Sequence, residues 1–115
     1  MSDKILKIEL LYFDGCPSWE NALEMLTASM KKLNVARDIR LIAVETEQEA
    51  VKNRFTGSPM IRINGEDLFP TGQTNFILGC RVYQTPEGLQ GWPTEEMILD
   101  QIEKLLSNKS INPGK

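Results

Sequence analysis

The sequence predicts an α/β fold in which a central mixed β-sheet is flanked by helices, with the elements in the order β-α-β-α-β-β-α. Short apolar runs alternate along the chain with segments whose apolar residues recur every three or four positions. The first two strand-like runs become apolar on both faces, which is typical of strands covered by helices above and below. The 115 residues, 41% of them hydrophobic, suffice for one domain with a buried core.

The first strand and the first helix are expected on either side of a short glycine-containing turn. The strand covers residues 5–14, where ILKIELLYFD begins as alternation and then turns apolar on both faces. Gly15 ends it, and Pro17 suits a first helical turn because its missing N–H has no partner there. Asn34 can stop the helix, whose apolar positions are Trp19, Leu23, Leu26, Met30 and Leu33.

A second strand is expected over residues 37–45, followed by a short helix over residues 47–55. Thr46 can cap this helix, and two glutamates lie near its positive end. A third strand is expected over residues 60–63, and Asn64-Gly65 forms a hairpin turn into residues 67–69.

The remaining chain combines a long connection with a final helix. Residues 70–93 form the connection, in which residues 81–84 are drawn as a short strand. The last helix begins near Thr94 and carries apolar residues on its inner face. We expect the core of the single domain to span about residues 4–106, and residues 107–115 to form a flexible tail.

Composition excludes several classes of function. The net charge is −3, and the 13 basic and 16 acidic residues are interleaved, so neither nucleic acid nor a membrane surface is an expected partner. The chain has no histidine and only two cysteines, Cys16 and Cys80, which cannot build a four-ligand zinc site. No cofactor is expected.

The chain shows neither a signal peptide nor a run of 18 apolar residues, so we expect a cytoplasmic protein whose thiols are mostly reduced.

The element order and two short motifs resemble the thioredoxin-like superfamily. Gly15-Cys16-Pro17 is similar to the glutaredoxin form of the active-site turn, and the stretch GSPMI that begins at Gly57 is similar to the proline loop before the third strand. The resemblance implies a cis Ser58-Pro59 bond in a loop that lies beside the reactive sulfur. Trp19 stands where dithiol members carry their second cysteine, so the usual CxxC cycle cannot run.

A narrower resemblance extends over more of the chain. YFDGCPSWENAL, the GSPxIxIxG segment and the downstream GCRVYxTPEG are similar to a group of small thioredoxin-like bacterial and archaeal proteins, some of which carry the name alkylmercury lyase. Organomercurial lyases of another fold work with two cysteines and an aspartate. Shared residue types alone do not transfer that activity.

Cys16 is the candidate nucleophile, because a strand-to-helix turn places its sulfur near unpaired backbone N–H groups. We expect an exposed sulfur at the electropositive tip of the helix, which favours the thiolate. The Asp14 carboxylate opposes this effect. If Asp14 were desolvated and protonated, it could instead relay a proton to a leaving group.

The second cysteine has two possible roles. Cys80 is either the thiol that resolves a mixed disulfide on Cys16 or a buried filler. The first role requires Cα atoms within about 7 Å.

Other residues are candidates for shaping the substrate site. Ser58 and Pro59 form the site if their bond is cis. Trp19 either caps the core or forms an apolar wall beside the sulfur. Arg81, like Arg62, either binds an anionic thiol such as glutathione or is a solvated surface charge. Tyr83 and Trp92 either pack in the interior or line a substrate groove.

Three functions follow from these residues. The first is a thiol-disulfide oxidoreductase in which Cys16 attacks a disulfide of a protein or small molecule, and Cys80 or an external thiol resolves the product. The second is a soft-metal or organomercurial thiol binder that clamps the metal between Cys16 and Cys80. The third is a binding module that keeps the fold without the reaction.

Overall fold

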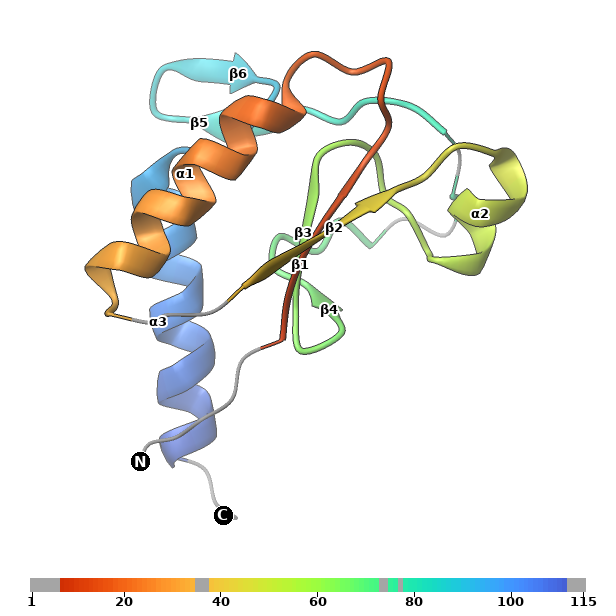
Figure 1. The fold of residues 1–115 in the computed structure, drawn as a ribbon. Coiled ribbons are helices and arrows are strands. Elements are labelled where there is room, and N and C mark those ends of the chain that lie inside the picture. The colour runs from red at the N-terminus through yellow and green to blue at the C-terminus, as the bar shows by residue number, and fades with distance from the viewer. Residues whose placement is uncertain (1–6, 35–37, 73–74, 77, 112–115) are drawn as a thin grey trace.

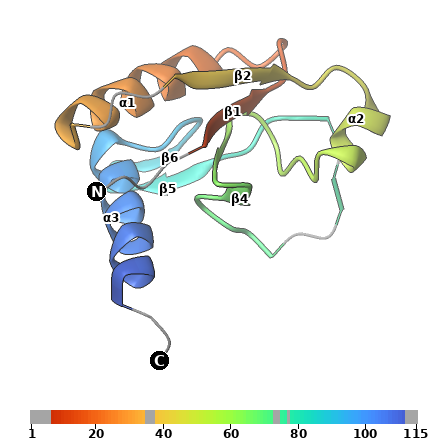
Figure 2. The ribbon, with the colours of Figure 1, turned by 60° about the horizontal axis from the view of Figure 1, so that its bottom comes forward.

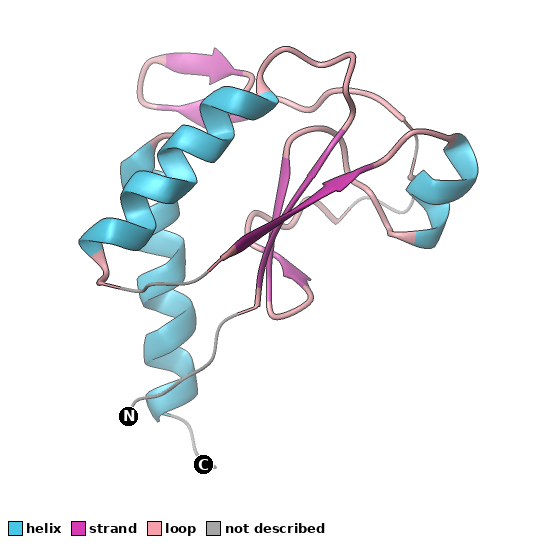
Figure 3. Cartoon of the chain, viewed as in Figure 1, coloured by secondary structure: helices cyan, strands magenta, loops and turns pink. Residues whose placement is uncertain are grey.

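A computed structural model of the chain describes residues 7–34, 38–72, 75–76 and 78–111, with the side chains of 106–111 left aside. Its helices and strands follow one another as Figure 1 labels them, and Figure 3 colours them by type. In chain order they are β1 (Ile8–Tyr12), α1 (Trp19–Lys32), β2 (Ile39–Ala43), α2 (Glu47–Lys52), β3 (Met60–Ile63), β4 (Glu66–Asp67), β5 (Tyr83–Thr85), β6 (Gly88–Gln90) and α3 (Glu95–Ile111).

Four strands form a mixed sheet in the order β2-β1-β3-β4. β1 is parallel to β2, with Ile8 opposite Ile39, and antiparallel to β3, with Ile8 opposite Ile63. β4 is antiparallel to β3, and β5 and β6 form a separate two-stranded sheet. The predicted fold class is confirmed, and the strand order agrees with a thioredoxin-like topology.

Two apolar clusters cover the opposite faces of the sheet. The larger cluster joins β1 and β3 to the two long helices, which lie together on one side of the sheet in Figure 2. The smaller cluster lies on the side of α2. Neighbouring residues of β1 alternate between them, since Leu10 belongs to the first cluster and Leu11 to the second. The prediction that β1 is buried on both sides is therefore confirmed.

The second strand differs from its prediction. The sequence predicts burial on both faces of this run, but β2 is an edge strand of the described sheet, and Leu41 is 45% exposed. A strand with an apolar sequence is buried on both faces only where neighbouring elements cover both of them.

Two local signals at helix ends are confirmed. Asn34 has φ 58° directly after α1, a conformation that asparagine tolerates better than most residues. Thr46 caps α2, since its Oγ1 accepts a hydrogen bond from the Glu49 N–H at 3.0 Å.

The long connection contains a hairpin where the sequence predicted one short strand. β5 begins at Tyr83, and it pairs with β6 across a turn in which the Thr85 hydroxyl donates to the Gly88 carbonyl at 2.7 Å. Gly88 has φ 107°, which favours glycine.

The last helix is longer than predicted. α3 continues to Ile111, whereas the sequence predicted a flexible tail from residue 107. The first helix-breaking residue after this point is Pro113, so low apolar content alone did not end the helix. The predicted tail beyond residue 111 lies outside the described residues. Within the part of the chain that is described, no helix is long and apolar enough to cross a membrane.

Candidate dithiol site

Cys16 lies in the turn that leads from β1 into α1. The Cys16 N–H donates to the Phe13 carbonyl at 2.9 Å and closes the turn. A Cβ atom at Gly15 would lie 2.9 Å from the end of the Phe13 ring, so a larger residue there would require that ring to shift. The helix begins at Trp19, two residues later than Pro17 suggests, and Ser18 at its N-cap makes no side-chain capping bond. Cys16 therefore precedes the uncapped end of α1.

The sulfur of Cys16 is buried, and the expectation of an exposed sulfur at the helix tip is wrong. Cys16 is 2% exposed, and its Sγ lies 3.5 Å from the Ser58 carbonyl oxygen, to which it donates. The loop around Ser58, to which Cys80 is bridged, therefore lies against the Cys16 sulfur. The expected position beside the Pro59 bend is confirmed.

The loop around Pro59 holds the Cys80 segment through backbone hydrogen bonds. The Ser58-Pro59 bond is cis, as the resemblance implied. The Ser58 N–H donates to the Gly79 carbonyl at 2.8 Å, and the Arg81 N–H donates to the Ser58 carbonyl at 3.0 Å. These bonds form a parallel bridge between Ser58 and Cys80. The Ser58 carbonyl thus contacts both the Cys16 sulfur and the residue after Cys80.

Gly57 allows this close approach. A Cβ atom at Gly57 would lie 2.8 Å from the Arg81 Cβ and 3.3 Å from the Cys80 carbonyl carbon. Its φ of 119° also favours glycine. A larger residue would push the Cys80 segment away from the loop.

The two cysteines meet at this bridge. Both are free thiols, and Cys80 is exposed whereas Cys16 is buried. A hydrogen bond with Cys16, partial burial and the charge of Cys16, in that order, raise the pKa of Cys80 to about 11. Cys80 therefore keeps its proton at neutral pH. The fold brings together two thiols that lie 64 positions apart in the sequence.

Two other predicted site residues lie in different surroundings. Asp14 is exposed, so the desolvation that a proton relay requires is absent. Trp19 stacks on the Tyr12 ring, with centroids 4.2 Å apart, and packs against the larger core cluster. Trp19 therefore caps the core, which is one of the two roles expected for it.

The two arginines are neither solvated nor free to bind an anion. The Arg81 side chain is 8% exposed, and its guanidinium pairs with Asp67 at 3.2 Å. The Arg62 side chain is 14% exposed and pairs with Glu9 at 3.4 Å. The expectation of surface charges is corrected at both positions, because Arg62 reaches Glu9 on the neighbouring strand β1 and Arg81 reaches Asp67 on β4.

The two remaining aromatic candidates pack in the interior, as one of their two expected roles required. Trp92 packs against the larger core cluster, and the hydroxyl of the buried Tyr83 donates to the Pro59 carbonyl.

Sequence reasoning missed two side chains that support the Cys80 segment. They are Thr56 and Asp67, which contact Arg81. One signal was available in part: residues 80–85 alternate between exposed and covered positions, and the covered positions include Arg81 and Tyr83, the two largest side chains of CRVYQT. No local signal points to Asp67 as the partner of Arg81.

Ser58 carries an unexplained polar atom at the site. Its hydroxyl oxygen is buried and has no hydrogen-bond partner among the described residues. A buried hydroxyl without a partner is unusual in a folded protein. Nothing in its surroundings assigns it a ligand.

Comparisons of the chain with protein-family models, with curated proteins and with solved structures found no match. Within the described residues, no group of three or more histidine, cysteine or acidic side chains could hold a metal ion. The chemistry that the site can perform must therefore be argued from the two sulfurs and their surroundings.

Proposed function

We propose that the protein is a thiol-disulfide oxidoreductase in which Cys16 and Cys80 alternate between a dithiol and a disulfide. The observation that carries this proposal is the bridge that brings the two cysteines together: the Cys16 thiol donates to the Ser58 carbonyl, and Ser58 is bridged to Cys80. An interaction with Cys16 that raises the pKa of Cys80 to about 11 supports it. Two thiols in contact can form a disulfide without a large movement of the chain. Such a pair requires neither a CxxC motif nor a cofactor.

The accessibility of the two sulfurs favours a division of labour that differs from the sequence prediction. Cys80 is exposed, so it is the sulfur that a partner disulfide reaches first. Cys16 is buried beneath it and is suited to closing the internal disulfide. The sequence had assigned the first attack to Cys16, on the expectation that its sulfur is exposed.

The first step consumes a partner disulfide R–S–S–R′. It begins when the two cysteines of the protein together lose one proton to water. Cys80 attacks one sulfur of the partner and forms a mixed disulfide, and R′S⁻ leaves. The proton that is lost to water comes from Cys80, because only its thiolate attacks. With a pKa of about 11, only about 10⁻⁴ of Cys80 is ionised at pH 7, so this step should be faster at higher pH.

The second step releases the partner. Cys16 gives its proton to R′S⁻ and attacks the Cys80 sulfur, which forms the internal disulfide and expels RS⁻. RS⁻ takes a proton from water. The partner disulfide gains two electrons and two protons and becomes two thiols, while the protein loses the same number. An external dithiol, or two monothiols, restores the reduced protein by the reverse sequence.

A chromogenic aromatic disulfide, 5,5′-dithiobis(2-nitrobenzoate), tests this proposal. The reduced protein should release two thionitrobenzoate anions per chain and retain no adduct, because Cys16 displaces the mixed disulfide from Cys80. Cys16→Ala should release one anion and keep one adduct on Cys80. A wild-type protein that keeps an adduct on each cysteine, or that does not react, contradicts the proposal, and absence of reaction leaves the binding-module alternative.

A second candidate function is soft-metal binding, and the same contact between the sulfurs favours it. Two thiolates suit linear coordination of Hg(II) or Cu(I), and such a site needs no third protein ligand. Titration with Hg(II) should protect both thiols from alkylation at one ion per chain. Protection that requires two ions per chain contradicts a shared site. Carbon–mercury cleavage gains no support from Asp14, which is exposed.

A further inference from the structure

We propose that the buried pair of Arg81 and Asp67 positions Cys80 over Cys16 and thereby sets the dithiol-disulfide equilibrium of the two cysteines. The inference rests on the proposed function, because it concerns the same two sulfurs. It assigns Arg81 a positioning role, acting through Cys80, in place of contact with substrate.

The guanidinium of Arg81 is held by three groups of the β3–β4 region. Its Nη1 lies 3.2 Å from Asp67 Oδ2 and 2.7 Å from the Thr56 hydroxyl. Its Nη2 donates to the Phe69 carbonyl at 2.7 Å. The Thr56 hydroxyl donates in turn to Asp67 Oδ2 at 3.1 Å. The side chains of Arg81 and Asp67 are only 8% and 12% exposed, so little water competes for these bonds.

The same residue is tied to the Pro59 loop through its backbone. The Arg81 N–H donates to the Ser58 carbonyl, which also accepts from the Cys16 thiol. The guanidinium carbon lies 4.5 Å from the centroid of the Tyr83 ring, and the Tyr83 hydroxyl donates to the Pro59 carbonyl. Arg81, the residue next to Cys80, is therefore attached to two supports, which are the Pro59 loop and the β3–β4 hairpin.

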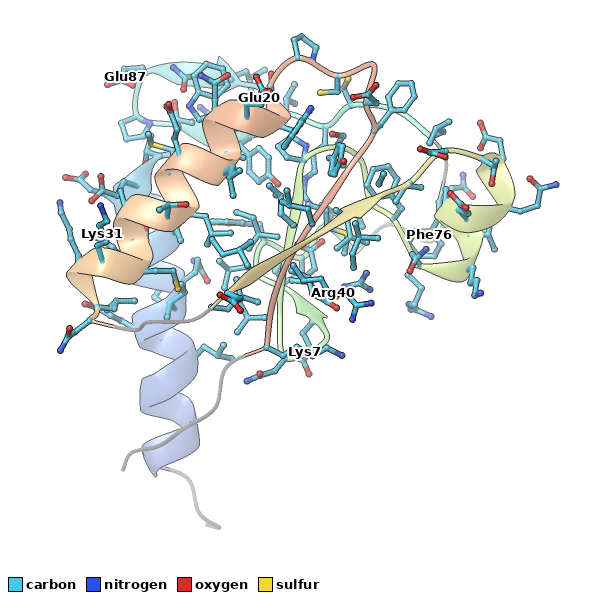
Figure 4. All side chains as sticks on the ribbon, viewed as in Figure 1. Lys7, Glu20, Lys31, Arg40, Phe76 and Glu87 are labelled. Carbon is cyan, nitrogen blue, oxygen red and sulfur yellow. The ribbon has the colours of Figure 1, made fainter. Side chains whose placement is uncertain are left out.

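The exposure of its other side chains explains why the Cys80 segment depends on the pair of Arg81 and Asp67. Cys80 and Val82 on either side of Arg81 are exposed, and Val82 is 63% exposed. The outward side chains thus contribute little burial, and the covered residues Arg81, Tyr83 and Thr85 must hold this segment of the chain in place. In Figure 4, Glu87 in the turn between β5 and β6 also points outward.

Positioning affects a disulfide through effective concentration. A thiol on a short flexible linker meets its partner at roughly millimolar effective concentration, whereas well-oriented groups reach about 10⁵ M. The equilibrium constant between the protein dithiol and glutathione disulfide measures this quantity directly. A clamp that fixes the residue beside Cys80 should therefore stabilise the disulfide relative to the dithiol, and its loss should shift the equilibrium towards the dithiol.

The chain offers a matched control in its second buried arginine pair. Arg62 and Glu9 face one another across β1 and β3, with side chains 14% and 9% exposed. Their burial resembles that of Arg81 and Asp67, but neither residue belongs to the Cys80 segment. Loss of either pair should lower the stability of the fold, whereas only loss of the Arg81 pair should change the cysteine equilibrium.

The experiment equilibrates the full chain with glutathione buffers of graded redox ratio and measures the internal disulfide by alkylation and mass spectrometry. The variants are Asp67→Asn and Arg81→Lys, with Glu9→Gln and Arg62→Lys as controls. We expect the equilibrium constant to fall at least tenfold in the first two, which corresponds to a reduction potential about 30 mV less negative. The two controls should stay within twofold of the wild type.

Three results overturn the inference in distinguishable ways. If Asp67→Asn and Arg81→Lys match the wild type, the pair does not position Cys80, although the proposed function stands. If the control variants shift the equilibrium equally, the effect is one of general stability. If the wild type forms no internal disulfide, the proposed function itself fails. Should Asp67→Asn not fold, Thr56→Val removes one bond to Arg81 and should give a smaller shift in the same direction.

Discussion

Replacement of Cys16 by alanine should make Cys80 more reactive. The hydrogen bond with Cys16 is the largest cause that raises the pKa of Cys80 to about 11, and the charge of Cys16 adds to it. Alanine removes both causes and leaves only the partial burial of Cys80. The pKa of Cys80 should therefore fall towards its ordinary value of 9.0. The direction is opposite to that expected if Cys16 activated Cys80.

The size of the effect follows from the ionised fraction. At pH 8 a thiol with a pKa of about 11 is about 10⁻³ ionised, and a thiol with a pKa of 9.0 is about 10⁻¹ ionised. The thiolate concentration thus rises by at most about 100-fold. A thiolate of lower pKa is a weaker nucleophile, with a Brønsted coefficient of about 0.4–0.5, which offsets roughly tenfold of this gain. Alkylation of Cys80 should become up to about tenfold faster.

The assay follows iodoacetamide labelling of the reduced protein from pH 6 to pH 11. Digestion and mass spectrometry separate the peptide that carries Cys80 from the one that carries Cys16. Cys16→Ser serves as a companion, because its hydroxyl can still hydrogen-bond but carries no charge, so it should lie between wild type and Cys16→Ala. An unchanged or slower rate at Cys80 in Cys16→Ala would refute the contact between the two thiols.

Two further substitutions test the support of the site. In urea unfolding, Gly57→Ala should destabilise the protein by at least about 1 kcal/mol more than Gly65→Ala. Both glycines have positive φ, but only a Cβ atom at position 57 would make a 2.8 Å contact. Equal losses of unfolding free energy would contradict the close approach at Gly57. Tyr83→Phe should cost about 1 kcal/mol at pH 7 through its lost hydrogen bond to the Pro59 carbonyl. Burial raises the pKa of Tyr83 above its ordinary 10.0. Above pH 10 the tyrosine therefore ionises in the unfolded chain first, and the stability of the wild type should fall more steeply than that of Tyr83→Phe. Parallel profiles of stability against pH would contradict this.

The predictable parts of the fold depend on short stretches of sequence. Thr46 was readable as a cap and Asn34 as a helix stop, because each acts on backbone groups within a few residues. The turn at Cys16 and the loop at Pro59 were likewise readable from their glycine and proline neighbours. Their contact was implied by the resemblance to thioredoxin-like proteins, and in the structure it arises because β1 and β3 are adjacent in the sheet.

The unpredicted parts depend on contacts between distant segments. Whether Cys16 is exposed is decided by the segment around Cys80, which lies in a connection without strong periodicity. The pairing of Arg81 with Asp67 joins β4 to a residue that lies two positions before β5, and nothing in either local sequence marks it. The same dependence explains the hairpin of β5 and β6, where only Gly88 gave a local sign of a turn.

Peptide mapping of the mildly oxidised protein tests the central claim most directly. The reduced chain is exposed to a limiting amount of a non-thiol oxidant at low protein concentration, and intact mass and proteolytic fragments are then measured. We predict a monomer that has lost two hydrogens and in which the Cys16 and Cys80 peptides are joined. A product linked between chains, or one in which Cys80 is oxidised while Cys16 remains a free thiol, would contradict the claim.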